Sequence, residues 1–271
     1  METGRSITST SPSRCHRIEP IVAVKSTRRN DHPTRDGEVQ SALEWLKAHG
    51  TQATLDGMAR YAIPSEKAYG VAMKDIKSLG QALGRNQELA AALWDTGVYE
   101  ARMLASFVGD PATISAAQMD GWCKEFDNWA FCDAMCFNLF DRTPHAWKKV
   151  TTWSKRLQEF EKRTAFALLW SLSVHDKQAT DAQLIQGLAR IEGAACDERN
   201  FVKKAVNMAL RAIGKRNAAL NAAAVTLARR MAASHDPTAR WVGADALKEL
   251  TNSALLKSLY ARASTRRGEN V

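Results

Sequence analysis

The strongest constraint on the fold of this 271-residue chain is a helical spacing of apolar residues that recurs after residue 37. Segments of roughly 10–20 residues carry apolar side chains at positions i, i+3, i+4 and i+7, which places them on one face of an α-helix. No segment alternates apolar and polar residues as a half-buried strand does, and no Asn-Gly hairpin turn is present. The pattern therefore predicts an all-α protein.

The predicted helices occupy most of the chain, and several start at capping sequences. Asn86 precedes one helix, Thr143 and Pro144 open another, and Asp236 and Pro237 open a late one. The segments are 39–48, 55–62, 69–83, 89–94, 99–108, 115–126, 128–140, 144–154, 160–174, 182–191, 201–213, 218–233, 237–250 and 253–263. From 89 onwards they form pairs at a spacing of roughly 30–40 residues, which is typical of helical repeats. We therefore expect a curved α-solenoid of stacked helix pairs.

The two ends of the chain differ from this pattern. Residues 1–36 are rich in Ser, Thr and Arg and lack an apolar stripe, which predicts a disordered arm or an over-extended start of the coding sequence. We expect one domain over 37–264 and a flexible tail over 265–271.

The charge balance indicates the class of partner. The chain has 38 Lys and Arg against 29 Asp and Glu, for a formal net charge of +9. A basic protein favours anionic partners such as nucleic acid, and the concave face of a basic solenoid can hold a duplex. No apolar run reaches the roughly 20 residues of a membrane span. Gly-rich phosphate loops, HExxH and GxSxG are absent from the sequence, which argues against common nucleotide-binding, metal-hydrolase and serine-hydrolase sites.

The cysteines allow two interpretations. Cys132 and Cys136 are one helical turn apart and Cys123 is nearby, so a metal site is conceivable with His145 as the close fourth ligand. All three lie in apolar helical segments, where a free cysteine behaves as a small hydrophobic residue. We expect buried thiols in a reducing cytosol rather than a metal site or disulfides.

Asp133 is the most unusual residue of the segment FDNWAFCDAMCFNLF at 126–140. A carboxylate among apolar side chains is costly unless another group stabilises it. Trp129 is four residues earlier on the same helix face, and Arg163 of the next long helix can pair with Asp133 across neighbouring helices. On residue pattern alone, Asp133 is either a structural carboxylate satisfied by Arg163 or a functional group.

Several stretches resemble one known family. They are DNWAFCDAM with the later KRTAF, GMARYAIPSEKAYGV, ELAAALWDTGVYEARMLASFVGDP and DPTARWVGADALKEL, within roughly 38–250. Together they resemble the AlkD-type DNA alkylation-repair glycosylases, which have HEAT-like helical repeats. The resemblance implies a monofunctional glycosylase that excises cationic N3- and N7-alkylated purines from double-stranded DNA. It implies no metal, nucleotide or other cofactor.

The resemblance also assigns expected roles to individual residues. Asp133 matches the carboxylate at the reaction centre, and Trp129 matches the Trp that lies against the sugar of the lesion. Arg163 matches an Arg beside the DNA backbone at the lesion, Tyr61 a Tyr near the DNA, and Arg211 an Arg that contacts the backbone. We expect the first three to be catalytic and the other two to bind DNA.

Two positions depart from the family pattern. Met208 in KAVNMALR stands where the family has a second lesion-facing Trp, and Ala72 stands where it has a Gln. Met keeps apolar contact but has no ring face for a cation. Lys203 and Lys204 beside Met208 are expected to neutralise phosphates.

These departures leave alternatives to the glycosylase interpretation. One is a weakly active or non-catalytic helical-repeat protein that binds distorted or branched DNA, and another is a scaffold for protein partners. For the glycosylase we expect a monomer, since a solenoid that holds DNA needs no second subunit, located in a bacterial cytosol or nucleoid.

Overall fold

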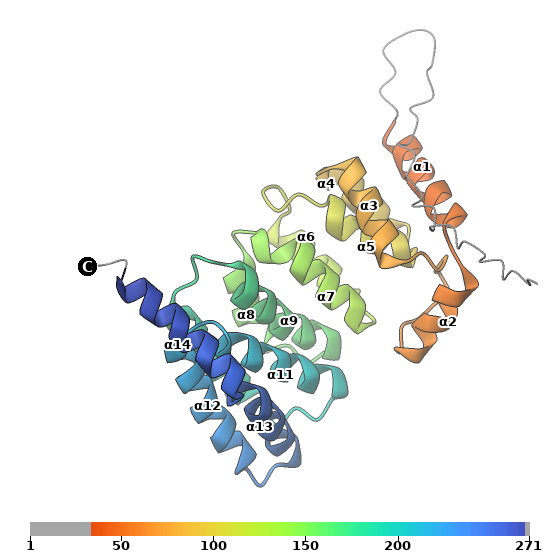
Figure 1. The fold of residues 1–271 in the computed structure, drawn as a ribbon. Coiled ribbons are helices and arrows are strands. Elements are labelled where there is room, and N and C mark those ends of the chain that lie inside the picture. The colour runs from red at the N-terminus through yellow and green to blue at the C-terminus, as the bar shows by residue number, and fades with distance from the viewer. Residues whose placement is uncertain (1–33, 269–271) are drawn as a thin grey trace, which may run out of the picture. The chain divides into compact units, whose positions relative to one another are not determined.

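A computed structural model describes residues 34–268 of the chain (Figure 1). Within this range it contains fourteen α-helices, one short 3₁₀ helix and no β-strand, so the all-α prediction is confirmed. Each predicted segment corresponds to one α-helix. The elements are α1 (Arg35–Ala48), α2 (Gln52–Arg60), α3 (Met73–Leu83), α4 (Gln87–Asp95), α5 (Tyr99–Val108), α6 (Ala116–Lys124), α7 (Trp129–Asn138), η1 (Phe140–Arg142), α8 (Ala146–Trp153), α9 (Glu159–His175), α10 (Asp181–Gly193), α11 (Asn200–Gly214), α12 (Ala218–Ala232), α13 (Pro237–Leu250) and α14 (Ser253–Gly268).

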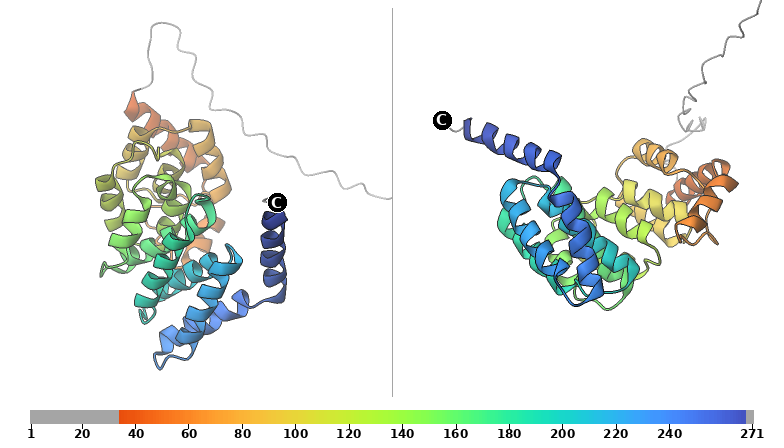
Figure 2. Two further views of the ribbon diagram at one scale, coloured as in Figure 1. Left: turned by 90° about the vertical axis from the view of Figure 1, so that its left-hand side faces the viewer. Right: turned by 60° about the horizontal axis from the view of Figure 1, so that its bottom comes forward.

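Alternate helices of the chain pack side by side in a row. Helix α3 contacts α5, α5 contacts α7, α7 contacts α9, α9 contacts α11, and α11 contacts α13. The intervening helices lie against this row, with α4 on α5, α8 on α9, α10 on α11 and α12 on α13. Figures 1 and 2 show the same succession in chain order. The prediction of stacked helix pairs is therefore confirmed.

The pair predicted over 115–140 packs differently. Helix α7 contacts α5 and α9, whereas α6 packs on α9. Two hydrogen bonds hold α6 near α8, from Lys149 Nζ to the carbonyl of Ala116 at 2.7 Å and from Trp153 Nε1 to Asp120 Oδ1 at 2.7 Å. The packing partners of α6 are therefore helices that follow α7 in the chain.

The first and last helices extend a few residues beyond the predicted domain limits. Thr34 caps α1 by accepting a hydrogen bond from Gly37 N at 3.4 Å, so residues 34–36 belong to the folded unit and not to an arm. Helix α14 continues to Gly268, four residues beyond the predicted end of the domain at 264. The rest of the predicted arm, 1–33, and residues 269–271 lie outside the described residues.

The predicted helix at 69–83 begins only at Met73. The buried carboxylate of Glu100 accepts hydrogen bonds from the backbone N–H groups of Tyr69, Gly70 and Val71 at 2.9, 2.7 and 3.3 Å. These donors satisfy the carboxylate and hold the segment in a non-helical conformation, in which Gly70 has a left-handed φ of 81° that glycine adopts without strain. A long-range side chain therefore overrides the local helical pattern.

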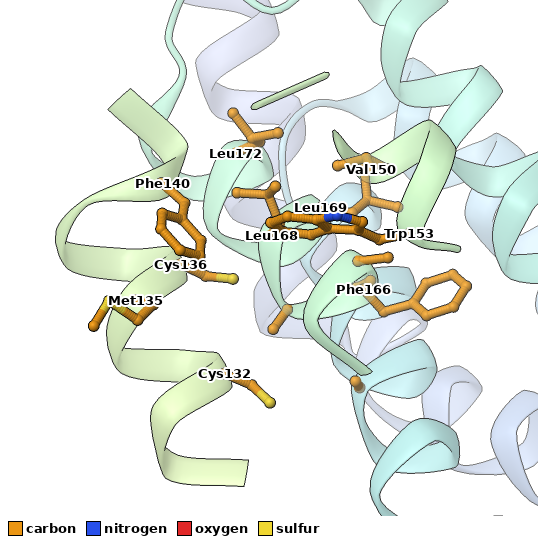
Figure 3. Close-up of a cluster of buried hydrophobic side chains, with 14 of the residues drawn as sticks. Cys132, Met135, Cys136, Phe140, Val150, Trp153, Phe166, Leu168, Leu169 and Leu172 are labelled. Carbon is orange, nitrogen blue, oxygen red and sulfur yellow. The ribbon is translucent and has the colours of Figure 1, made fainter. Parts of the chain in front are cut away.

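Two of the buried thiols predicted from the sequence, on α7, contribute to its interface with α9. Cys132 Sγ and Cys136 Sγ, one turn apart, donate to the carbonyls of Phe160 and Thr164, also one turn apart, at 3.5 Å each. Figure 3 shows both side chains of α7 pointing toward the helix that carries Leu168. This packing fixes α7 against α9, so the residue that follows Cys132, Asp133, lies at the edge of the interface.

Close packing of α12 on α13 depends on Gly243. A Cβ at this position would lie under 3.0 Å from backbone atoms of Ala228, Met231 and Ala232.

We expect Gly243→Ala to lower the free energy of unfolding by about 1–3 kcal/mol through overpacking, measured by urea denaturation. Gly121→Ala is the matched control, since a Cβ there meets nothing within 4 Å. That change should stabilise α6 by about 0.5–1 kcal/mol, and equal effects at the two positions would contradict the close-packing explanation.

Candidate functional site

Helix α7 positions both Trp129 and Asp133. Its N-cap, Asn128, accepts hydrogen bonds from the N–H groups of Ala130 and Phe131 at 3.0 and 3.1 Å and so fixes the start of the helix at Trp129. Asp133 follows one turn later on the same face. Its side chain is 20% exposed, so the carboxylate is mostly buried but still reaches solvent.

Arg163 of α9 binds this carboxylate directly. Its Nη2 donates to both Oδ1 and Oδ2 of Asp133 at 2.8 Å, and its Nη1 donates to the carbonyl of Phe201 on α11 at 2.9 Å. One guanidinium thus connects three neighbouring helices of the row. The sequence-based pairing of Asp133 with Arg163 is present in the structure.

Arg163 lies in the interior of the protein, where its guanidinium contacts protein acceptors. The side chain is only 3% exposed, and two of its three nitrogens are engaged by Asp133 and Phe201. The contact that the structure shows for this guanidinium is therefore with Asp133. A contact of Arg163 with a DNA phosphate stays a prediction.

The environment of Asp133 makes its charge sensitive to pH. Burial raises the pKa of the Asp133 carboxyl above its usual value, and the Arg163 guanidinium offsets part of that rise. Asp133 therefore takes up a proton at a higher pH than an exposed aspartate does. A carboxylate of this kind acts most strongly on a positive charge that develops near its exposed side.

Trp129 lies one helical turn before Asp133 on α7 and contacts Tyr61 and Arg163. Its indole Nε1 donates to the carbonyl of Tyr61, the residue after α2, at 2.8 Å, and the Arg163 guanidinium carbon lies 6.0 Å from its ring centroid. Ala62 has φ 54°, a backbone conformation that L-residues adopt at a cost, and this turn aims the Tyr61 carbonyl at the indole. The Tyr61 side chain is 66% exposed. The structure thus brings Tyr61, Trp129, Asp133 and Arg163 together.

The expected DNA-binding residues of α11 have different environments. Lys204 is exposed, and Lys203 Nζ lies 5.2 Å from the ring centroid of Trp241 on α13. Arg211 donates to Glu249 Oε2 at 2.8 Å, so its charge already has a partner. Met208 is partly buried, and α11 connects to the Asp133 group through the Phe201 carbonyl.

Two groups at the Asp133 site, and one exposed residue elsewhere on α13, were not singled out from the sequence. The Asn128 cap has a detectable signal, since Asn just before an apolar helix is a common N-cap. The Phe201 carbonyl has none, because any residue provides a backbone carbonyl. Trp241 on α13 does have a signal in the sequence, since it follows Arg240 in a basic protein.

The three clustered cysteines are free and buried, as predicted. Burial raises the pKa of the Cys132 thiol to about 12, which keeps it protonated as the donor to Phe160. Within the part of the chain that the structure describes, no group of three or more His, Cys, Asp or Glu residues is arranged to hold a metal ion. Over the same residues, no helix has both the length and the apolar character needed to cross a membrane.

The row of paired helices places the chain in the class of helical-repeat proteins. Its distinguishing feature is the partly buried ion pair of Asp133 with Arg163. The model of the DNA alkylation repair enzyme family matches residues 42–250, and the chain belongs to this family. A comparison with curated proteins finds no match.

A solved structure shares the fold. It is described as "a new family of proteins related to the HEAT-like repeat DNA glycosylases with affinity for branched DNA structures". The TM-score is 0.64 and the identity 21%, over 70% of this chain and 82% of that one. The HEAT-like architecture expected from the sequence is thereby confirmed.

The pairing of Arg163 with Asp133 predicts a specific pattern of stabilities. Arg163→Met leaves a mostly buried carboxylate without its cation and should lower the free energy of unfolding by about 3 kcal/mol. Adding Asp133→Asn should recover part of the loss, because the unpaired charge is gone. Urea denaturation of the two variants measures both effects.

The control for this comparison is an exposed ion pair. Arg230 pairs with Glu192, and their side chains are 57% and 49% exposed. Arg230→Met should change the free energy of unfolding by less than about 1 kcal/mol. An Arg163→Met variant that is no less stable than Arg230→Met would contradict the bridging role of Arg163.

Proposed function

We propose that the protein is a monofunctional DNA glycosylase that removes cationic N3- and N7-alkylated purines from double-stranded DNA. The observation that carries the proposal is the Asp133 carboxylate, partly exposed and held by Arg163 next to the Trp129 ring. Membership in the DNA alkylation repair enzyme family supports it.

The chemistry requires one negative group at the sugar. In an alkylated purine nucleotide the base is already positively charged, so it leaves without an acid. As the C1′–N bond breaks, its electron pair moves to the base, which becomes neutral, and positive charge develops at C1′ and the ring oxygen. A fixed carboxylate in a poorly hydrated position stabilises this oxocarbenium-like state. Asp133 provides that group.

Hydrolysis is completed by water. A water oxygen forms a bond to C1′ while one of its protons passes to the Asp133 carboxylate, which acts as general base. One carboxylate is sufficient here, whereas ordinary glycosidases need a second carboxyl as acid. Trp129 would lie against the sugar and exclude bulk water, and Arg163 would hold Asp133 in place. These steps require neither a second subunit nor a nucleotide.

Binding of the duplex is assigned to Tyr61 and to basic residues of α11. Tyr61 and Lys204 are exposed, and Lys203 lies on the same helix as Lys204. Arg211 would contribute only after giving up its bond to Glu249. Contacts of this kind neutralise phosphates, so the affinity should fall steeply as salt rises.

A second candidate function is DNA binding without excision. Met208 favours it, because a thioether provides no ring face for the cationic base or sugar. The solved structure of the same fold belongs to proteins with affinity for branched DNA structures, which supports this alternative.

The test of the proposal is Asp133→Asn. We expect release of 7-methylguanine or 3-methyladenine from methylated duplex DNA to fall by about 10²–10³-fold, while binding to unmodified duplex persists. The exposed Asp95 at the end of α4 offers a matched control, Asp95→Asn, which should leave the excision rate unchanged.

The wild-type excision rate should decline on acidification with a midpoint above the ordinary aspartate pKa of about 3.9, since protonation removes the negative charge of Asp133.

Equal excision rates in the wild type and Asp133→Asn would refute the catalytic role. A wild type that binds duplex DNA but releases no base would favour the second candidate.

Met208→Trp separates the two candidates further. A ring at this position should raise the excision rate by about 2- to 30-fold if Asp133 is catalytic and one wall of the site is missing. Met73→Trp, at a residue of α3 that is 44% exposed, is the control and should leave the rate unchanged. If neither Met208→Trp nor Met73→Trp releases a base from methylated duplex DNA, the absence of a ring at position 208 does not explain the lack of excision.

A further inference from the structure

Trp241 is an exposed aromatic residue outside the Asp133 site. It lies on α13 and is 43% exposed, whereas Trp94 and Trp153 are buried in the core at 1% and 0%. Exposing an indole has a cost in water, and a large aromatic surface of this kind is enriched at binding sites. The fold itself does not require a Trp at this exposed position.

The surroundings of Trp241 are basic. Lys203 Nζ of α11 lies 5.2 Å from its ring centroid, in a cation–π arrangement. Arg240, the residue before it, and Lys204, the residue after Lys203, are both exposed. One carboxylate, Asp245, is one turn further along α13 and half-buried. The charge around the ring therefore favours an anionic partner.

An indole with a cation at its ring matches the chemistry of a nucleotide. The ring face stacks on a base, and the adjacent ammonium neutralises the phosphate of the same strand. Inside a continuous duplex each base is already stacked on both faces, so an indole gains contact only with an unpaired or terminal base. An exposed Trp–Lys pair is thus better suited to a strand that leaves the duplex than to the duplex interior.

We propose that Trp241 and Lys203 form a second nucleic-acid contact, at which an unpaired nucleobase of a flap or branch stacks on Trp241. The inference rests on the proposed function in requiring DNA as the partner, but it does not require base excision. Helix α13 packs on α11, and α11 accepts the bond from Arg163 that organises the Asp133 site. The second contact therefore belongs to the same row of helices as the first.

The experiment compares two unmethylated DNAs, an intact blunt duplex and the same duplex with a short single-stranded flap. Binding of the full-length protein is measured by fluorescence anisotropy, with 2-aminopurine in the flap to report base stacking. We expect the wild type to prefer the flap DNA and to quench 2-aminopurine. Trp241→Ala should lose about 5- to 100-fold in affinity for the flap DNA, with little change for the blunt duplex.

Three further variants sharpen the comparison. Trp241→Phe keeps a ring and should retain most of the flap preference and the quenching. Lys203→Gln should weaken binding to both DNAs and reduce the salt dependence, because it removes a phosphate contact. Ile185→Ala on α10 removes another exposed apolar side chain, 44% exposed, and should behave as wild type.

Several outcomes would overturn the inference. Equal losses on both DNAs in Trp241→Ala would place the indole against the duplex backbone, and no loss on either would remove it from the DNA contact. A wild type that binds blunt duplex without preferring the flap overturns this inference alone. A wild type that binds neither DNA overturns the proposed function as well, and a protein partner would then be the better explanation of the exposed ring.

Discussion

The interaction on which the candidate site depends is the bond of one guanidinium to two neighbouring helices. Arg163 extends from α9 to the Asp133 carboxylate of α7 and to the Phe201 carbonyl of α11. Burying an arginine is costly unless its donors are satisfied, so these two acceptors are conditions for the fold as well as for the site. Displacing α7 or α11 relative to α9 would break at least one of them.

Burial and the Arg163 guanidinium have opposite effects on the charge of Asp133. Burial strengthens the field of a carboxylate but favours its neutral form, and the nearby guanidinium restores the charged form while cancelling part of the field. A carboxylate in this position is useful for a reaction in which positive charge arises close to its open side. That condition is met by a substrate that brings its own cationic leaving group, because no second carboxyl is then needed as an acid.

Local sequence patterns predicted the helices well and failed where a distant side chain intervened. Apolar spacing and capping residues located the helices because both act within a few residues along the chain. The start of α3 was placed too early, since the Glu100 carboxylate holds the segment from Tyr69 to Val71 in a non-helical conformation. The partner of α6 was also misjudged, because Asp120 and Lys149 tie that helix toward α8.

The sequence by itself determined the helical class, the repeat architecture, the family and the pairing of Trp129 with Asp133 on one helix face. These properties depend on residue types at short, regular spacings. Tertiary structure decided that Arg163 is buried and positions Asp133, that Arg211 is paired with Glu249, and that Lys203 lies against the exposed Trp241. The physical reason is that burial and the choice of ion-pair partner depend on how helices far apart in the sequence pack, which no local spacing encodes.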